Sequence, residues 1–175
     1  RIYALAFGYF CLISGIYAVS FWLPTILKGA GVTSTMAIGM YSALPYVAAA
    51  ILMFLAARSS DRHQERRWHS ATLAFVGAAT LAVAAFTADN LTLSLLSITV
   101  ATAAMWAAYT VFWAIPSEYL QGTAAAGGIA LINSLGLLGG FVSPTLIGAV
   151  KDLTGSLEGG LLAMVALLAA GGLAI

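Results

Sequence analysis

Charged residues are scarce in this chain of 175 residues. Only 7% of its residues are Asp, Glu, Lys or Arg, whereas 62% are hydrophobic, and the mean hydropathy is +1.00. Soluble domains carry about 25% charged residues, and they need most of them to keep their surface in water. The composition therefore excludes a soluble protein and predicts a membrane protein whose solvent and partner is the lipid bilayer.

Cysteine and histidine are scarce as well. Cys11 is the only cysteine and lies in an apolar stretch, so the chain has no disulfide or cysteine-based metal framework, and we expect a buried side chain. The only histidines, His63 and His69, lie in one polar stretch, whereas a membrane enzyme needs a nucleophile and a base that converge. The sequence therefore predicts no enzyme, no catalytic residue, no metal and no cofactor. The net charge of +1 is too small to indicate a nucleic-acid partner.

Long apolar segments make up most of the chain. A membrane-spanning helix needs about 20 apolar residues to cross about 30 Å of hydrocarbon. We expect an all-α bundle of six transmembrane helices, over residues of about 2–27, 36–57, 70–88, 91–116, 124–150 and 157–175. No linker interrupts the pattern, so 1–175 is predicted to be a single transmembrane domain. Because the chain begins without Met and stops within an apolar run, we expect it to be part of a longer protein.

A polar stretch over residues 58–69 separates the second and third apolar segments. It holds six of the thirteen charged residues, four of them arginine. Short loops rich in Arg and Lys stay on the cytoplasmic side. We therefore predict a cytoplasmic loop at 58–69 and, because six spans bring the chain back to its starting side, two cytoplasmic ends. Lys28 and Lys151 would then lie outside.

Two of the predicted helices carry polar and aromatic stripes at helical spacing. In the first helix the stripe contains Tyr3, Phe7, Phe10, Ser14, Tyr17 and Phe21, and in the fourth Thr99, Thr102, Trp106, Tyr109 and Trp113. The third and sixth helices have almost no such residues. This recurrence predicts a three-plus-three inverted repeat, with helices one, two, four and five on a concave face and helices three and six toward lipid. In the fifth helix, Gly136 and Gly140 have the spacing that lets two helices pack closely.

Four stretches of the chain resemble a known family. They are Tyr17-Ala-Val-Ser-Phe-Trp-Leu-Pro-Thr25, Ser60-Asp-Arg-His-Gln-Glu-Arg-Arg-Trp-His69, Gly128-Ile-Ala-Leu-Ile-Asn-Ser-Leu-Gly-Leu-Leu-Gly-Gly-Phe141 and Lys151-Asp-Leu-Thr-Gly-Ser156. With these stretches in this order, the chain resembles the C-terminal half of a major facilitator superfamily transporter. More narrowly, it resembles the anion:cation symporter family of organic-anion permeases.

The resemblance implies that the chain supplies helices seven to twelve of a twelve-helix secondary transporter. The N-terminal six-helix half would be its partner, and the bacterial inner membrane its location. The implied substrates are small organic anions such as sugar acids, aromatic acids or dicarboxylates. Since no acid lies within the predicted spans, proton coupling would depend on the N-terminal half.

Three positions depart from the family's pattern. Ala57 and Gln64 stand where the loop motif usually has glycine, which predicts a loop that is less sharply folded. Leu137 stands where many relatives have a second asparagine in the fifth helix. The substrate of this chain could therefore differ from theirs.

The resemblance also implies roles for individual residues. Asp61, Arg62 and Arg66 would form a cytoplasmic gate that opens when the two halves move, although they could also serve only to fix topology. Asn133 lies in mid-helix, where an unsatisfied amide is costly, so it is expected to contact substrate or to form an interhelical hydrogen bond. Tyr17, Tyr109 and Trp113 lie on the aromatic stripes of the first and fourth predicted helices.

Those three aromatic residues would contribute donors to the same substrate site, with simple packing as the alternative.

Other functions stay open at this point. An efflux carrier for neutral or amphipathic compounds fits the polar loop equally well, and a non-transporting assembly domain would make no use of Asn133. The polar groups on the concave face also predict that the fragment alone associates with a second copy of itself.

Overall fold

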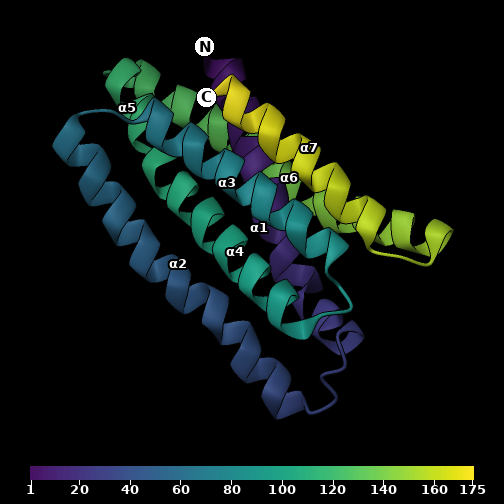
Figure 1. Cartoon of the computed structure of the whole chain (residues 1–175). Helices are drawn as coiled ribbons and strands as arrows, with labels where there is room; N and C mark the ends of the chain where they lie inside the picture. Colours follow the sequence, from purple (N-terminus) through teal and green to yellow (C-terminus); the bar gives the residue numbers. More distant parts are fainter.

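The computed structural model describes the backbone of residues 1–175 and every side chain except those of residues 123 and 124. It is helical throughout, as predicted (Figure 1). The helices are α1 (Ile2–Gly29), α2 (Thr35–His63), α3 (Arg67–Phe86), α4 (Leu91–Phe112), α5 (Ala114–Tyr119), α6 (Thr123–Thr154) and α7 (Glu158–Ala174).

Six spans make up the membrane bundle, because α4 and α5 together form one of them. Five are long and apolar enough to span a bilayer when α4 and α5 are taken together, and α7 adds an apolar helix of 17 residues. The predicted fourth helix is divided at Trp113. Pro116 explains the division, because its nitrogen cannot donate to the carbonyl of Phe112 four residues earlier.

The packing of the helices confirms the three-plus-three repeat. α1 packs mainly on α6 and α7, while α4 packs mainly on α2 and α3. Exchanging α1 with α4, α2 with α6 and α3 with α7 converts the first set of contacts into the second. α1 and α4 are the most buried of the long spans, and α2 and α6 the least. The core of the bundle therefore lies along α1 and α4.

Close approach of α1 and α6 depends on glycine, as the spacing of Gly136 and Gly140 predicted. A Cβ atom on Gly136 would lie 1.9 Å from Cδ1 of Tyr9, and one on Gly140 would lie 3.1 Å from Cδ1 of Tyr17. Between them, a Cβ on Gly139 would lie 2.5 Å from the backbone oxygen of Phe10. Rings and backbone of α1 occupy the space that side chains would otherwise fill.

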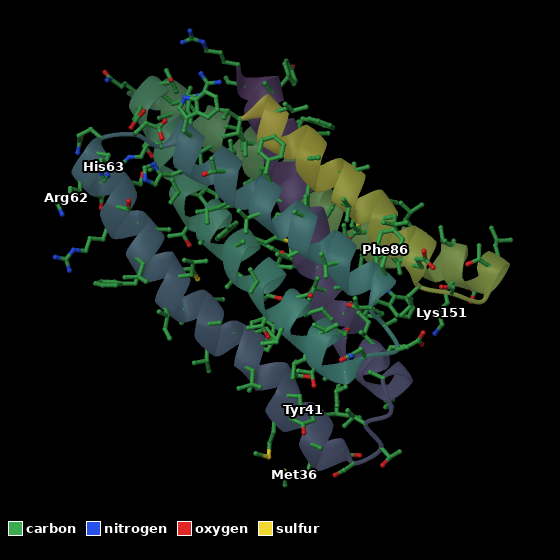
Figure 2. All side chains as sticks on the ribbon, viewed as in Figure 1. Met36, Tyr41, Arg62, His63, Phe86 and Lys151 are labelled. Atoms are coloured by element: carbon green, nitrogen blue, oxygen red, sulfur yellow. The ribbon has the colours of Figure 1, made fainter. Side chains whose placement is uncertain are left out.

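Charged residues gather at the two ends of the bundle (Figure 2). One end, here called the arginine end, carries Arg1, Arg58, Asp61, Arg62, Glu65, Arg66, Arg67 and Glu118. The other, the lysine end, carries Lys28, Asp89, Lys151, Asp152 and Glu158. The N-terminus, the C-terminus and α5 all lie at the arginine end (Figure 1).

Three long helices contain a proline. Pro24 lies in α1, Pro45 in α2 and Pro144 in α6. Each is within about three helical turns of the lysine end of its helix. The parts of these helices nearer the arginine end contain no proline.

The prediction of a loop over 58–69 is wrong in its extent. α2 continues to His63 and α3 begins at Arg67, so only residues 64–66 lie outside the helices. The polar residues mark where the chain leaves hydrocarbon, but water and headgroups do not end a helix by themselves.

Gln64 ends α2 in the left-handed conformation, with φ 53° and ψ 34°. Its backbone N–H and its side-chain Nε2 both donate to the oxygen of Asp61, at 3.4 and 2.7 Å, and Glu65 N donates to Ser60 O at 3.2 Å. The turn is therefore as sharp as a glycine would make it, and the expected looser loop is wrong.

Candidate functional site

Tyr9 is the centre of a cluster of side chains between α1, α4 and α6. Its side chain is only 2% exposed. The ring stacks on Phe112 at a centroid distance of 5.5 Å, meets Trp113 edge-on at 4.9 Å and lies 5.9 Å from the ring of Tyr109. Such aromatic pairs fix one another's orientation. We call Tyr9, Tyr109, Phe112, Trp113 and Asn133 the Tyr9 cluster.

Asn133 joins this cluster from α6. The hydroxyl of Tyr9 donates to Oδ1 of Asn133 at 3.3 Å. This contact confirms that the amide forms an interhelical hydrogen bond, which was one of the two expected roles. Among the side chains and backbone that the structure describes, the amide nitrogen of Asn133 has no acceptor. Two N–H donors thus remain available to a ligand.

The cluster contains three of the four residues that the sequence suggested for substrate binding. Asn133, Tyr109 and Trp113 all surround Tyr9. Tyr17 does not join them, because it lies eight residues further along α1, roughly 12 Å toward the lysine end. Its side chain is exposed and its ring covers Gly140.

Sequence reasoning missed Tyr9 itself. The aromatic stripe predicted on α1 runs through Phe7 and Phe10 on a neighbouring face, so Tyr9 appeared to be outside it. The available signal was in α6, where Gly136 lies three residues after Asn133 and leaves room for a large ring.

A second polar contact lies on α1 and α2, nearer the lysine end than the Tyr9 cluster. The hydroxyl of Tyr46 on α2 donates to Oγ of Ser20 on α1 at 2.9 Å. Tyr17, Ser20 and Tyr46 are all exposed. The bundle therefore carries polar groups at two depths. The group around Tyr9 is buried, and the group around Ser20 is exposed.

At the arginine end, Arg66 connects α2 with α5. Its guanidinium pairs with the carboxylate of Asp61 and donates to Oγ of Ser60 at 3.1 Å. Its Nε lies 3.5 Å from Oε1 of Glu118 on α5. Arg66 is 17% exposed, whereas Asp61 is 67% exposed. Since exposed ion pairs contribute little stability, the network positions these elements more than it stabilises them.

The predicted gate is thus only partly assembled here. Asp61 and Arg66 are brought together, but Arg62 points away from the bundle and forms no ion pair within the part of the chain whose side chains are described (Figure 2). Glu118 was missed, although an acid at the arginine end of the fourth helix was a signal for pairing with the arginines.

Glu65 caps the start of α3. Its carboxylate accepts hydrogen bonds from the backbone N–H groups of Trp68 and His69, at 2.8 and 3.1 Å, and lies 3.1 Å from Nδ1 of His69. Burial acts to raise the pKa of Glu65, but the hydrogen bonds from Trp68 and His69 and the nearby imidazole outweigh it, so the pKa is lowered. This carboxylate is therefore ionised near neutral pH.

The Tyr9 cluster offers hydrogen-bond donors and aromatic surface without a charged group. Within the described side chains, no group of three His, Cys, Asp or Glu residues could hold a metal ion. The arrangement can bind and orient a small polar molecule against aromatic rings. It has no nucleophile paired with a base.

An inverted-repeat bundle with a polar, aromatic site between its helices is the architecture of half a secondary transporter. The family model described as Major Facilitator Superfamily matches residues 1–144 of the chain. The chain therefore belongs to this superfamily.

Curated relatives agree with this assignment. The chain is 41% identical over 147 residues to "Putative metabolite transport protein NicT" of Pseudomonas putida, which covers 84% of the chain and 34% of that protein. It is 42% identical over 168 residues to a "Putative tartrate transporter" of Agrobacterium vitis, covering 96% of the chain and 37% of the relative. A "Quinolone resistance transporter" of Acinetobacter baumannii is 37% identical over 161 residues, covering 92% of the chain and 37% of the relative. The chain thus spans little more than a third of these proteins.

Proposed function

We propose that the chain is the C-terminal half of a secondary active transporter that carries small organic anions across a bacterial inner membrane. Sugar acids, aromatic acids and dicarboxylates are the substrate classes, and alternating access between two halves is the mechanism. The observation that carries the proposal is Asn133, whose Oδ1 accepts a hydrogen bond from Tyr9 in the aromatic cluster while its amide nitrogen has no acceptor among the described residues. The resemblance to a protein named for tartrate transport supports the substrate class.

The chemistry of the Tyr9 cluster suits one side of a carboxylate site. The Asn133 amide, the Tyr109 hydroxyl and the Trp113 indole are neutral donors that can orient carboxylate oxygens. None of them compensates the negative charge of the substrate. Among the described residues, all the acids and bases lie at the two ends of the bundle. We therefore assign to the N-terminal half both the cationic group that pairs with the substrate anion and the acid that couples transport to protons.

The surfaces of α2 and α6 suit contact with that N-terminal half. Their long apolar windows are only 17% and 22% buried. Exposed apolar residues recur along both helices at spacings that place them on one face: Met36, Met40, Leu44, Val47, Ile51 and Phe54 on α2, and Leu131, Leu138 and Val142 on α6. When the fragment is isolated, we propose that a second copy covers these faces as a two-fold homodimer.

Orientation follows from the charges at the two ends. Five basic residues lie at the arginine end and two at the lysine end. We therefore place the arginine end, both chain ends included, in the cytoplasm. Asp61, Arg62 and Arg66 then belong to a cytoplasmic gate, with Arg66 as the residue that couples α2 to α5. A membrane-impermeant thiol reagent applied to intact cells should label a single cysteine at Asn90 but not one at Gln64; the reverse pattern would contradict this orientation.

The test of the substrate site is Asn133→Ala in the full-length transporter, reconstituted in liposomes with a proton gradient and a panel of organic acids. Loss of one or two hydrogen bonds should weaken substrate affinity by about 1–3 kcal/mol. Asn90→Ala is the matched control, because Asn90 is the only other asparagine and accepts a hydrogen bond from Leu93 N at the start of α4. That control should lower stability by about 1 kcal/mol and leave affinity unchanged. Equal affinities for Asn133→Ala and wild type would leave Asn133 with its interhelical role alone.

A second function, efflux of neutral or amphipathic compounds, is favoured by the aromatic content of the site. Trp106 lies 5.6 Å from Tyr109 and extends the rings of the Tyr9 cluster. The relative named for quinolone resistance agrees with this alternative. The same panel discriminates, since an efflux carrier would lower the cellular accumulation of aromatic drugs and show no gradient-driven uptake of organic acids.

A further inference from the structure

A cavity of about 680 Å³ lies at the lysine end, bounded by the ends of α1 and α3 and by the turn between α6 and α7. Its volume is in the range of about 300–1,000 Å³ that is usual for small-molecule sites. Thr25, a lining residue, lies sixteen residues after Tyr9 on α1, which corresponds to roughly 24 Å along the helix. This lysine-end cavity is therefore separate from the Tyr9 cluster.

Both lysines of the chain line the cavity, as do two carboxylates. Lys28 comes from the last turn of α1 and Lys151 from the last turn of α6. Asp89 comes from the turn after α3, and Glu158 is the first residue of α7. Four separate segments thus bring two positive and two negative groups to one cavity, whose formal charge is zero.

These four groups do not neutralise one another through direct contact. Within the described side chains, the ion pairs all lie at the arginine end, and neither lysine has a carboxylate oxygen within 4.0 Å. Lys151 is instead held beside an aromatic ring, with its Nζ 5.1 Å from the ring centroid of Trp22 on α1. The cavity therefore has cationic and anionic groups that remain available to a ligand.

Apolar residues form the rest of the cavity wall. Ile26 and Leu161 line its inner part, while Phe86 lies at the end of α3 and is 67% exposed. Figure 2 shows Phe86 and Lys151 on the same side of the lysine end. Tryptophan at the end of a span is expected at headgroup depth in a bilayer, and lysine at such an end extends its ammonium group to the headgroups.

We propose that the lysine-end cavity binds the headgroup of a zwitterionic phospholipid, in which a phosphate carries an ammonium group. The phosphate pairs with Lys28 and Lys151, and the ammonium group pairs with Asp89 and Glu158. The acyl chains leave along Phe86 into the bilayer. A purely anionic ligand fits less well, because the two carboxylates would repel it and would keep no partner of their own. With the arginine end in the cytoplasm, this lipid belongs to the outer leaflet.

The experiment measures lipids retained by the purified full-length transporter in native mass spectrometry. Phosphatidylethanolamine and phosphatidylglycerol with identical acyl chains are offered in equal amounts. Wild type should retain the ethanolamine lipid about tenfold better, the effect of one charge-assisted hydrogen bond. Lys28→Gln combined with Lys151→Gln should lose both lipids. Asp89→Asn combined with Glu158→Gln should still bind lipid but with a ratio near one.

Asp152→Asn is the matched control, since Asp152 follows Lys151 in the sequence but does not line the cavity. It should behave as wild type. Equal retention of the two lipids by wild type, or unchanged retention by the lysine double variant, would overturn the proposal.

A second measurement does not depend on the folding of any variant. Wild-type protein is illuminated with a phosphatidylethanolamine that carries a photoreactive group on its headgroup. Labelling of peptides that contain residues 84–89 or 151–158 supports the proposal, and labelling confined to other peptides contradicts it. If free phosphoethanolamine abolishes the labelling while the lipid itself is not retained, the ligand is a soluble zwitterion and the lipid assignment is wrong.

Discussion

The contact between Gly136 and Tyr9 gives the sharpest prediction about the candidate site. Gly136→Ala would place a methyl group 1.9 Å from Cδ1 of Tyr9. Carbon atoms in contact prefer a separation of about 3.5–4.0 Å, so the ring or the helix must move by roughly 1.6 Å. Because Tyr9 is wedged against Phe112 and Trp113, the ring has no free direction to take.

The expected cost follows from these contacts. Overpacking a filled core costs about 1–3 kcal/mol, and the displaced Tyr9 hydroxyl also loses its bond to Asn133, for about 1 kcal/mol more. Alanine is the better helix former and offsets up to about 1 kcal/mol. Gly136→Ala should therefore destabilise the full-length transporter by about 1–3 kcal/mol and weaken substrate binding.

Thermal unfolding in detergent and equilibrium binding of a transported acid measure the two effects. Gly127→Ala on the same helix is the control, since no atom that the structure describes lies within 4 Å of its added Cβ, and it should leave the melting temperature unchanged or higher. On a Tyr9→Ala background the penalty of Gly136→Ala should largely vanish. Equal melting temperatures and affinities for Gly136→Ala and Gly127→Ala would refute the reasoning.

Two further predictions concern the turn between α2 and α3. Gln64→Gly should be more stable than Gln64→Ala by about 1 kcal/mol in chemical unfolding. Both variants lose the hydrogen bond from Nε2 to Asp61 O, but only glycine adopts φ 53° without strain. Equal stability of the two variants would show that this turn stores no strain. Glu65→Gln should be less stable than wild type by about 1 kcal/mol at pH 7, since it weakens the cap of α3. The pKa of Glu65 is lowered on folding, so this advantage exists above the ordinary value of about 4.3 and is lost as the pH falls through the lowered one; a difference that persists unchanged at pH 3 would contradict the role of the charge.

Much of the fold was predictable because the bilayer imposes simple rules on sequence. Spans of about 20 apolar residues, polar ends and a recurring stripe gave the helices, the repeat and the close packing at Gly136. The extent of the polar turn was not predictable from those rules. They locate the hydrocarbon boundary, whereas the end of α2 depends on the backbone conformation of one residue, Gln64.

The candidate site was predictable only in part, for a geometric reason. A stripe on one helix shows which residues share a face, but not which partner helix covers that face. Asn133, Tyr109 and Trp113 came together because each lies on a face that packs against α1. Tyr17 shares α1 with Tyr9 but lies at another depth, and depth within a site depends on how α1 and α6 slide against each other at their glycines.

The prolines of α1, α2 and α6 give three long helices a point of reduced stiffness. Each proline leaves the carbonyl four residues earlier without its helical donor, at Ser20, Tyr41 and Gly140, so each helix has a ready hinge there. Ser20 and Tyr41 lie in the parts of α1 and α2 nearer the lysine end, and Gly140 lies near the middle of α6, whereas Arg66 connects α2 with α5 at the opposite end. For the transporter proposed above, we therefore expect motion at the lysine end to include bending of these three helices.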